Sequence, residues 1–235
     1  MKGLIFEELN GGASCRTYLL VCPRTREALL VDPVLEYVPA YVQRLARDRL
    51  RLATVVDTHT HADHLSGGWK LARETGALHA GAPEGVVHRP LREGEVLEVG
   101  ELRLTVWETP GHTADSLVLM MEDRVLTGDT LLIGATGRTD LPTGDAEDEF
   151  RSLRRLLSLP EETLVFPAHD YSGRTFSTIY HERLTNPRLR LEHDAFIRLM
   201  MAPRKEKPAR LAEALEYNTH PRELVEEVAA STWSI

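Results

Sequence analysis

The sequence predicts an α/β fold in which two β-sheets pack together and helices cover them. With 235 residues, the chain is long enough to bury a sizeable core in one domain. Two sets of short segments rich in β-branched and aliphatic residues predict the sheets, and segments with apolar residues at helical spacing lie between and after them. We therefore expect one domain over residues 1–235, with a helical C-terminal extension from about residue 201.

The first sheet is expected from three segments that are bounded by proline, glycine or charged residues. These segments lie at 17–21, 27–32 and 53–57. Residues 38–50, between the second and third segments, have the apolar spacing of a helix. Residues 66–76 also predict a helix, which ends at a glycine.

The second sheet is expected from strands at 77–81, 95–99, 102–110, 115–122 and 124–129. Residues 147–160 then predict an amphipathic helix that is ended by Pro160, because proline cannot continue a helix. Residues 163–170 predict a strand that leads into a loop. Beyond residue 180 the chain is charged and mostly helical, with a break near residues 202–208.

The composition excludes several classes of protein. The formal net charge of −8 argues against nucleic acid as the main partner, since nucleic-acid-binding domains usually carry a basic face. No segment reaches transmembrane length, and the N-terminal residues lack the apolar stretch of a signal peptide. Cys15 and Cys22 indicate two reduced thiols in a cytoplasmic protein rather than a disulfide framework. Scarce amides and abundant arginine indicate a thermophilic source, or a genomic base composition with the same effect.

A dense group of metal-binding residue types follows the third predicted strand. Residues 57–64 are DTHTHADH, which places His59, His61, Asp63 and His64 close together. Imidazoles and carboxylates are costly to crowd together unless a cation collects them. The carboxyl end of a strand is also where α/β folds usually build their sites.

Three later segments each place one further ligand at the end of a strand or in a glycine-flanked loop. PGHT contains His112, TGDT contains Asp129, and PAHD contains His169. Histidine and carboxylate ligands without thiolate suit zinc, iron or manganese, and exclude the closed, cysteine-rich type of structural zinc site. Alone, GHT or TGD is a common turn, whereas the HxHxDH spacing is far more specific. Five further histidines have no such context and are expected at the surface or around the ligands: His79, His88, His181, His193 and His220.

These four motifs, in this order, resemble those of the metallo-β-lactamase superfamily. The resemblance implies an αββα sandwich of two mixed β-sheets flanked by helices, with a metal site along one edge between the sheets. In dinuclear members, one metal would be bound by His59, His61 and His112. The other would be bound by Asp63, His64 and His169, with Asp129 bridging the two. Because this fold supports several kinds of hydrolysis as well as redox chemistry, it does not by itself determine the reaction.

Three stretches resemble one branch of that superfamily, the persulfide dioxygenases (ETHE1-like enzymes). They are LVDPVLE at 30–36, LLIGATGRTDLPTGD at 131–145 and FPAHDYSGRTFSTIYHERLTNPRL at 166–189. The resemblance implies one Fe(II) per chain, bound by His59, His112 and Asp129. The substrate would be glutathione persulfide or a similar thiol persulfide, which O₂ oxidises to sulfite and the free thiol. The other motif residues would surround the ligands: His61, Asp63, His64 and His169.

Three further residues are implied as contacts of the glutathione carrier: Arg138, Tyr171 and Arg188. Arginine suits the carboxylates of such a peptide, although in an arginine-rich chain each could instead form a surface ion pair. The ligand set agrees with independent chemistry, because two histidines and one carboxylate leave open positions on an Fe(II) that activates O₂. Thr136 departs from the family pattern, since some relatives have a cysteine there.

The main alternative is a glyoxalase II-like dinuclear hydrolase, a thioesterase in which a metal-bound hydroxide attacks the carbonyl. It would use all seven ligands and hold zinc, or mixed zinc and iron. Against it, such enzymes usually carry a larger C-terminal helical domain and lack the GRTD and NPR motifs. A metal-binding module without catalysis is less well supported, because seven ligands exceed the need of a structural site. Neither nucleic acid nor membrane is expected as a partner, and a homodimer is possible on this sequence.

Overall fold

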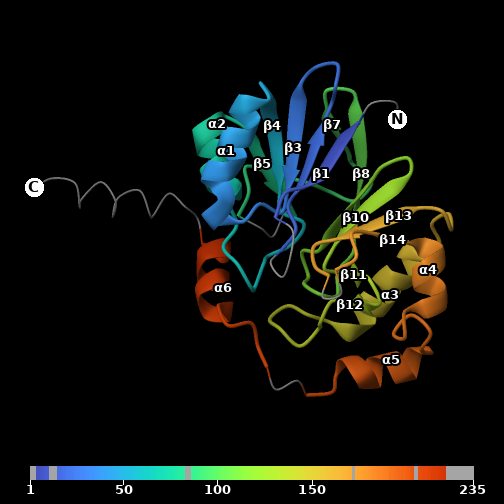
Figure 1. Cartoon of the computed structure of the whole chain (residues 1–235). Helices are drawn as coiled ribbons and strands as arrows, with labels where there is room; N and C mark the ends of the chain where they lie inside the picture. Colours follow the sequence, from blue (N-terminus) through green and yellow to red (C-terminus); the bar gives the residue numbers. More distant parts are fainter. Residues whose placement is uncertain (1–3, 11–14, 83–85, 171–172, 204–205, 221–235) are drawn as a thin grey trace, which may run out of the picture.

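Two six-stranded sheets face each other, and helices cover the outer face of each (Figure 1). The computed structural model describes residues 4–10, 15–82, 86–170, 173–203 and 206–220. This arrangement is the αββα sandwich implied by the motifs, and the fold prediction is confirmed.

The first sheet contains the N-terminal strands in chain order. They are β1 (Ile5–Glu8), β2 (Tyr18–Val21), β3 (Glu27–Val31), β4 (Arg51–Val56), β5 (Leu78–Gly81) and β6 (Arg89–Pro90). The sheet is mixed, because β1, β2 and β3 pair antiparallel while β3 to β6 pair parallel. Parallel neighbours β3, β4 and β5 therefore end at the same edge of the sheet.

The second sheet has the order β14 (Ser177–Thr178), β13 (Leu164–Pro167), β10 (Arg124–Gly128), β9 (Leu117–Met120), β8 (Leu102–Glu108) and β7 (Val96–Val99). Strands β10 and β13 run parallel, so both end at the edge that carries the polar motifs. A small ribbon of β11 (Leu131–Leu132) and β12 (Ala135–Thr136) follows β10.

Helices lie on both outer faces. The first half of the chain contains a short 3-10 helix (Leu35–Tyr37), α1 (Val38–Arg47) and α2 (Gly68–Thr75). The second half contains α3 (Ala146–Leu156), α4 (Ile179–Thr185) and α5 (His193–Met200). Helix α6 (Leu211–Thr219) crosses back toward the first half of the chain (Figure 1). Helix α3 begins at Asp145, whose side chain accepts a hydrogen bond from the Asp148 amide and so caps the first turn.

The apolar residues form three layers. Between the sheets, Tyr18, Leu29 and Val56 of the first sheet share a cluster with Leu104 and Phe166 of the second. Because successive residues of a strand point to opposite faces, the neighbours of these residues are buried under helices instead. Leu30 and Val55 lie in a cluster with Val38 and Leu71 of the helices, and Val125 and Val165 lie in one with Leu153 and Phe196. Burial on both faces explains the continuous apolar runs of these strands.

Most predicted elements are present, with ends that differ by a few residues. The strand expected at 77–81 in the second sheet is instead β5 of the first sheet, where it pairs parallel with β4. The segments missed by the sequence analysis are the edge strand β1, where Glu7 and Glu8 interrupt the apolar pattern, and the two-residue strands β6, β11, β12 and β14. In the described part of the chain, no helix has the length and apolar character needed to cross a membrane.

Candidate metal centre

The seven predicted ligand residues come together at one edge of the sandwich, where strands from both sheets end. His59, His61, Asp63 and His64 lie in the loop between β4 and α2, and His112 lies in the loop between β8 and β9. Asp129 directly follows β10, and His169 follows β13. Two backbone hydrogen bonds join these loops, from the Leu117 amide to the Thr58 carbonyl at 2.7 Å and from the Ala168 amide to the Gly128 carbonyl at 2.9 Å.

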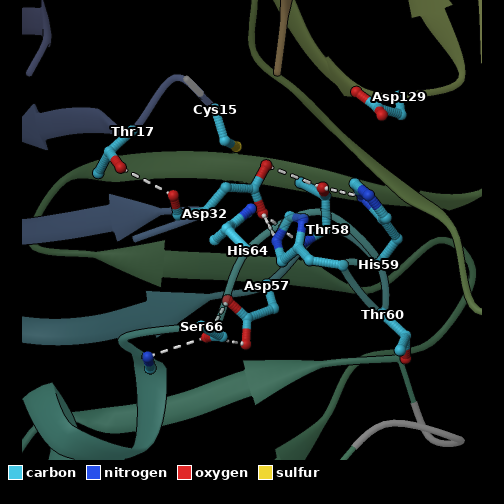
Figure 2. Close-up of polar contacts among 12 residues, drawn as sticks. Cys15, Thr17, Asp32, Asp57, Thr58, His59, Thr60, His64, Ser66 and Asp129 are labelled. Carbon is cyan, nitrogen blue, oxygen red and sulfur yellow. Dashed lines mark hydrogen bonds and ion pairs between the residues drawn. The ribbon is translucent and has the colours of Figure 1, made fainter. Parts of the chain in front are cut away.

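Three of the seven residues form a compact group that can hold a metal ion. One ligand atom from each of His59, His112 and Asp129 lies within 4.8 Å of the other two. The two histidine residues are each 4% exposed, so water has little access to the group. Figure 2 shows that Asp129 approaches from a different part of the chain than His59. Because both sheets contribute, the group depends on the closed sandwich.

Hydrogen bonds fix which ring nitrogen of each histidine faces this group. Thr58 Oγ1 donates to Asp32 Oδ2 at 2.9 Å, so it accepts from His59 Nδ1, also at 2.9 Å. His112 Nδ1 donates to the Arg138 carbonyl at 2.7 Å. In both rings the Nε2 lone pair is therefore left for a metal, which is the arrangement that outer partners impose on histidine ligands. The donor set of two neutral imidazoles and one carboxylate fits a hard or borderline cation such as Fe(II).

Gly128, directly before Asp129, is required by the backbone. Its φ is +50°, a conformation that L side chains rarely adopt. A Cβ at this position would also lie only 2.6 Å from Thr58 Oγ1, the atom that fixes the His59 ring. The glycine of the TGD motif thus permits the close approach of β10 to the histidine loop.

His169 makes hydrogen bonds with both ring nitrogens, to two different carboxylates. Nδ1 lies 2.7 Å from Asp129 Oδ1, and Nε2 lies 3.0 Å from Asp63 Oδ2. Burial lowers the pKa of His169, but Asp129 and Asp63 outweigh it and raise the pKa well above its usual value. Both ring nitrogens of His169 are thus engaged by carboxylates. In the described residues, Asp63, His64 and His169 do not form a compact ligand group of the kind found for His59, His112 and Asp129.

Two aspartates that the sequence analysis did not single out, one buried and one partly buried, organise the histidine loop. Asp32, which follows β3, accepts hydrogen bonds from the Thr58 amide at 2.7 Å and from its hydroxyl at 2.9 Å. Asp57 accepts from Ser66 Oγ at 2.7 Å and from His79 Nε2 at 2.8 Å. The sequence analysis expected His79 either at the surface or around the ligands, and the structure places it around the ligands. Asp32 lies in the LVDP stretch, which was noted only as a family resemblance.

Asn218 of α6 also holds this loop and was not predicted. Its side-chain amide donates to the His61 and His64 carbonyls, each at 2.9 Å, and its oxygen accepts from the Ser66 amide at 2.9 Å. One side chain thereby satisfies three backbone groups that lie more than 150 residues away in the sequence. Because a long-range contact leaves no local pattern, no sequence signal could have found it.

The predicted carrier-binding arginines lie near His112. Arg138 donates from Nε and Nη2 to Asp140, each at 2.8 Å, and from Nη1 to the Glu206 carbonyl at 2.9 Å. Arg188 donates to the Thr136 carbonyl at 2.8 Å and to its hydroxyl at 2.9 Å. Arg138 thus lies in the 136–138 segment and orients His112 through its backbone carbonyl, while Arg188 contacts the first residue of that segment. Tyr171 lies outside the described residues.

Comparison with known proteins agrees with this fold. A model of the metallo-β-lactamase superfamily matches residues 10–93 and 82–169. Persulfide dioxygenase ETHE1, mitochondrial, from Homo sapiens is 34% identical over 229 residues, which cover 92% of this chain and 87% of the human protein. A crystal structure of ETHE1 from Myxococcus xanthus has a TM-score of 0.87 at 40% identity, and the match covers 90% of this chain and 96% of that one.

A hydroxyacylglutathione hydrolase from Tolumonas auensis is 36% identical, but over only 68% of this chain and 64% of that protein. The chain belongs to the metallo-β-lactamase superfamily. Within the superfamily, it belongs with the persulfide dioxygenases of the ETHE1 type. The match covers a larger share of those proteins than of the hydrolase.

The contact between α6 and the loop predicts a stability effect. Asn218→Ala leaves three backbone groups without their partner, and each buried group left unsatisfied costs about 1–3 kcal/mol. We expect the free energy of unfolding to fall by at least about 1 kcal/mol, measured by urea denaturation. Glu216→Ala, an exposed position on the same helix, is the control and should change stability by less than about 0.5 kcal/mol. Equal effects of the two substitutions would contradict the role of Asn218.

Proposed function

We propose that the protein is a persulfide dioxygenase that oxidises glutathione persulfide, or a similar low-molecular-weight persulfide, to sulfite and the free thiol. The observation that carries the proposal is the compact group of His59, His112 and Asp129, together with the engagement of His169 in hydrogen bonds. Similarity to the human and Myxococcus proteins over most of the chain supports the same reaction. For the glutathione substrate the balance is GSSH + O₂ + H₂O → GSH + H₂SO₃.

We propose one Fe(II) per chain, held by His59, His112 and Asp129. An Fe(II) with two histidines and one carboxylate supplies open coordination positions and redox chemistry toward O₂. The chain's own residues prepare these ligands. Thr58 and the Arg138 carbonyl hold the two rings with Nε2 toward the group, and His169 holds one oxygen of Asp129. The second oxygen, Oδ2, lies 3.6 Å from His112 Nε2 and is left for the metal.

The remaining motif residues then serve as orienting groups. Asp63 links His169 to His64 through its two oxygens, at 3.0 Å and 3.3 Å. Because His169 is held from both sides, the Asp129 carboxylate cannot rotate freely about its Cβ–Cγ bond. Such outer contacts fix ligand orientation and typically change metal affinity by about 10–100-fold.

We propose that Arg138, Arg188 and Tyr171 position the thiol carrier. Arg138 and Arg188 lie beside the segment that orients His112, which places positive charge next to the proposed iron site. Planar guanidinium groups suit the two carboxylates of glutathione. Binding energy from these remote contacts would hold the persulfide sulfur near the metal and reduce the entropic cost of its encounter with O₂.

The alternative is a dinuclear, glyoxalase II-like hydrolase with zinc or mixed zinc and iron. It needs His169 and Asp63 as ligands of a second metal, and the observed hydrogen bonds between them weigh against that role. The experiments below can distinguish it from the dioxygenase.

Four further predictions rest on the sequence alone: a cytoplasmic location, a thermophilic source, a homodimer, and a single domain with a helical extension.

The metal ligands can be tested by substitution. We expect Asp129→Ala, His59→Ala and His112→Ala to lose the iron while retaining their circular-dichroism spectra. His169→Ala should retain one iron per chain, with affinity reduced by about 10–100-fold because only an orienting partner is lost. Metal content is measured by elemental analysis after anaerobic purification. If His169→Ala lost half of a two-metal complement, the site would be dinuclear.

The reaction itself is tested with an oxygen electrode. Iron-loaded protein supplied with glutathione persulfide should consume one O₂ for each sulfite formed, as the balanced equation requires. The same preparation is assayed for hydrolysis of S-lactoylglutathione. Rapid hydrolysis without persulfide-dependent O₂ uptake would replace the dioxygenase by the hydrolase.

Arg138→Ala tests the carrier contact. Loss of a charged hydrogen bond worth about 1.5–3 kcal/mol should raise KM for the persulfide by about 10–100-fold, with a smaller change in kcat. Arg151→Ala is the matched control, since this arginine is 72% exposed on α3. A fall in kcat with unchanged KM would indicate that Arg138 acts on His112 rather than on the carrier.

A further inference from the structure

A second compact group of ligand atoms lies next to the proposed iron site and contains sulfur. Cys15, His61 and His64 each offer one atom, and the three atoms lie within 4.8 Å of one another. All three side chains are buried, with exposed fractions of 1%, 1% and 6%. The proposed dioxygenase reaction does not use this group.

We propose that Cys15, His61 and His64 form a second metal site, which takes a thiophilic divalent cation of the zinc type. The set differs from the Asp63, His64 and His169 set expected for a dinuclear member of the superfamily. It is adjacent to the iron ligands, because the ring centroids of His59 and His61 are 4.2 Å apart.

Three of the four ring nitrogens of this group make no hydrogen bond in the described structure. Neither ring nitrogen of His61 makes a hydrogen bond, although both are buried. His64 Nδ1 is engaged with Asp63 Oδ1 at 3.3 Å, while its Nε2 is buried without a partner. Unpaired buried polar atoms are costly, and a metal ion would satisfy both rings at once. Figure 2 shows the Cys15 side chain directed toward the region of Asp32 and His64.

The surroundings already hold these ligands in place. Asp32 Oδ1 lies 3.3 Å from His61 Nε2, and the same carboxylate is fixed by two hydrogen bonds from Thr58. A carboxylate behind a histidine is the usual outer partner of a metal ligand, and it leaves Nδ1 of His61 for the ion. Asn218 holds the His61 and His64 carbonyls and so limits the movement of their loop.

Geometry and charge both favour a cation here. Bond lengths of about 2.3 Å to sulfur and about 2.0 Å to nitrogen place tetrahedral ligand atoms about 3.3–3.5 Å apart. From separations of at most 4.8 Å, the group therefore closes by at most about 1.5 Å. Burial and the nearby carboxylates Asp32 and Asp63 raise the pKa of the Cys15 thiol well above its usual value. A bound cation reverses this effect, because a coordinated thiol is deprotonated. One thiolate with two imidazoles selects zinc-like ions over harder ones.

Cobalt(II) reports thiolate coordination directly and serves as the probe in place of zinc. The full-length protein is loaded anaerobically with one equivalent of Fe(II) and then titrated with Co(II). We expect a thiolate-to-cobalt charge-transfer absorption in the near ultraviolet that saturates at one cobalt per chain. Because Cys15 and Cys22 are the only cysteines, the absorption should vanish in Cys15→Ser and persist in Cys22→Ser.

A second substitution tests the histidines. His64→Ala removes a ligand outside the proposed iron set and should weaken cobalt binding by more than about 100-fold, which exceeds the effect of losing an outer partner. No charge-transfer absorption in the wild type, the same absorption in Cys15→Ser, or unchanged affinity in His64→Ala would each overturn the proposal. Persulfide-dependent O₂ uptake is measured on the same iron-loaded protein without cobalt. The experiments can therefore contradict the proposed dioxygenase activity without contradicting the proposed thiolate site, and the reverse.

Discussion

The hydrogen bond between His169 and Asp129 joins the parts of the site that the fold brings from different strands. Asp129 Oδ1 is held by His169, which leaves Oδ2 on the side of His112. His169 in turn contacts Asp63, so the second sheet is connected to the histidine loop of the first. If this bond were lost, one oxygen of the partly buried Asp129 carboxylate would lack its partner, while His169 would keep only its contact with Asp63. The arrangement of the compact ligand group therefore depends on it.

The same bond bears on how many metals the seven motif residues can hold. A dinuclear site of the family type needs His169, His64 and Asp63 as ligands, and here Asp63 hydrogen-bonds with His169 Nε2 and His64 Nδ1, whereas His64 Nε2 makes no hydrogen bond. The proposed mononuclear site and the alternative dinuclear site contain the same motif residues, which is why the HxHxDH pattern alone did not distinguish oxygenase from hydrolase.

The sequence was sufficient for the sandwich and for the gathering of the seven motif residues. Strands such as 27–31 and 164–167 have strong local patterns. Each runs parallel to a neighbour in its own sheet, β3 to β4 and β13 to β10, so the carboxyl ends of each pair lie at the same edge. The contributions of Asp32, Asp57 and Asn218 were not predicted. Each acts through a contact with a residue far away in the chain, and a lone aspartate after a strand or an asparagine in a charged helix is common without such a role.

Cys15 illustrates the same limit in another way. By sequence it is an isolated thiol that was expected to be reduced, and it was not counted among the ligands. The fold brings it to His61 and His64 because the segment before β2 is anchored to the far sheet, where the Arg16 amide donates to the Ala168 carbonyl at 2.8 Å. Residue 168 directly precedes His169, so one backbone hydrogen bond fixes the position of the thiol relative to both ligand groups. A donor set that contains sulfur therefore lies beside one of nitrogen and oxygen alone, with the rings of His59 and His61 adjacent, and the two sets differ in the cations they favour.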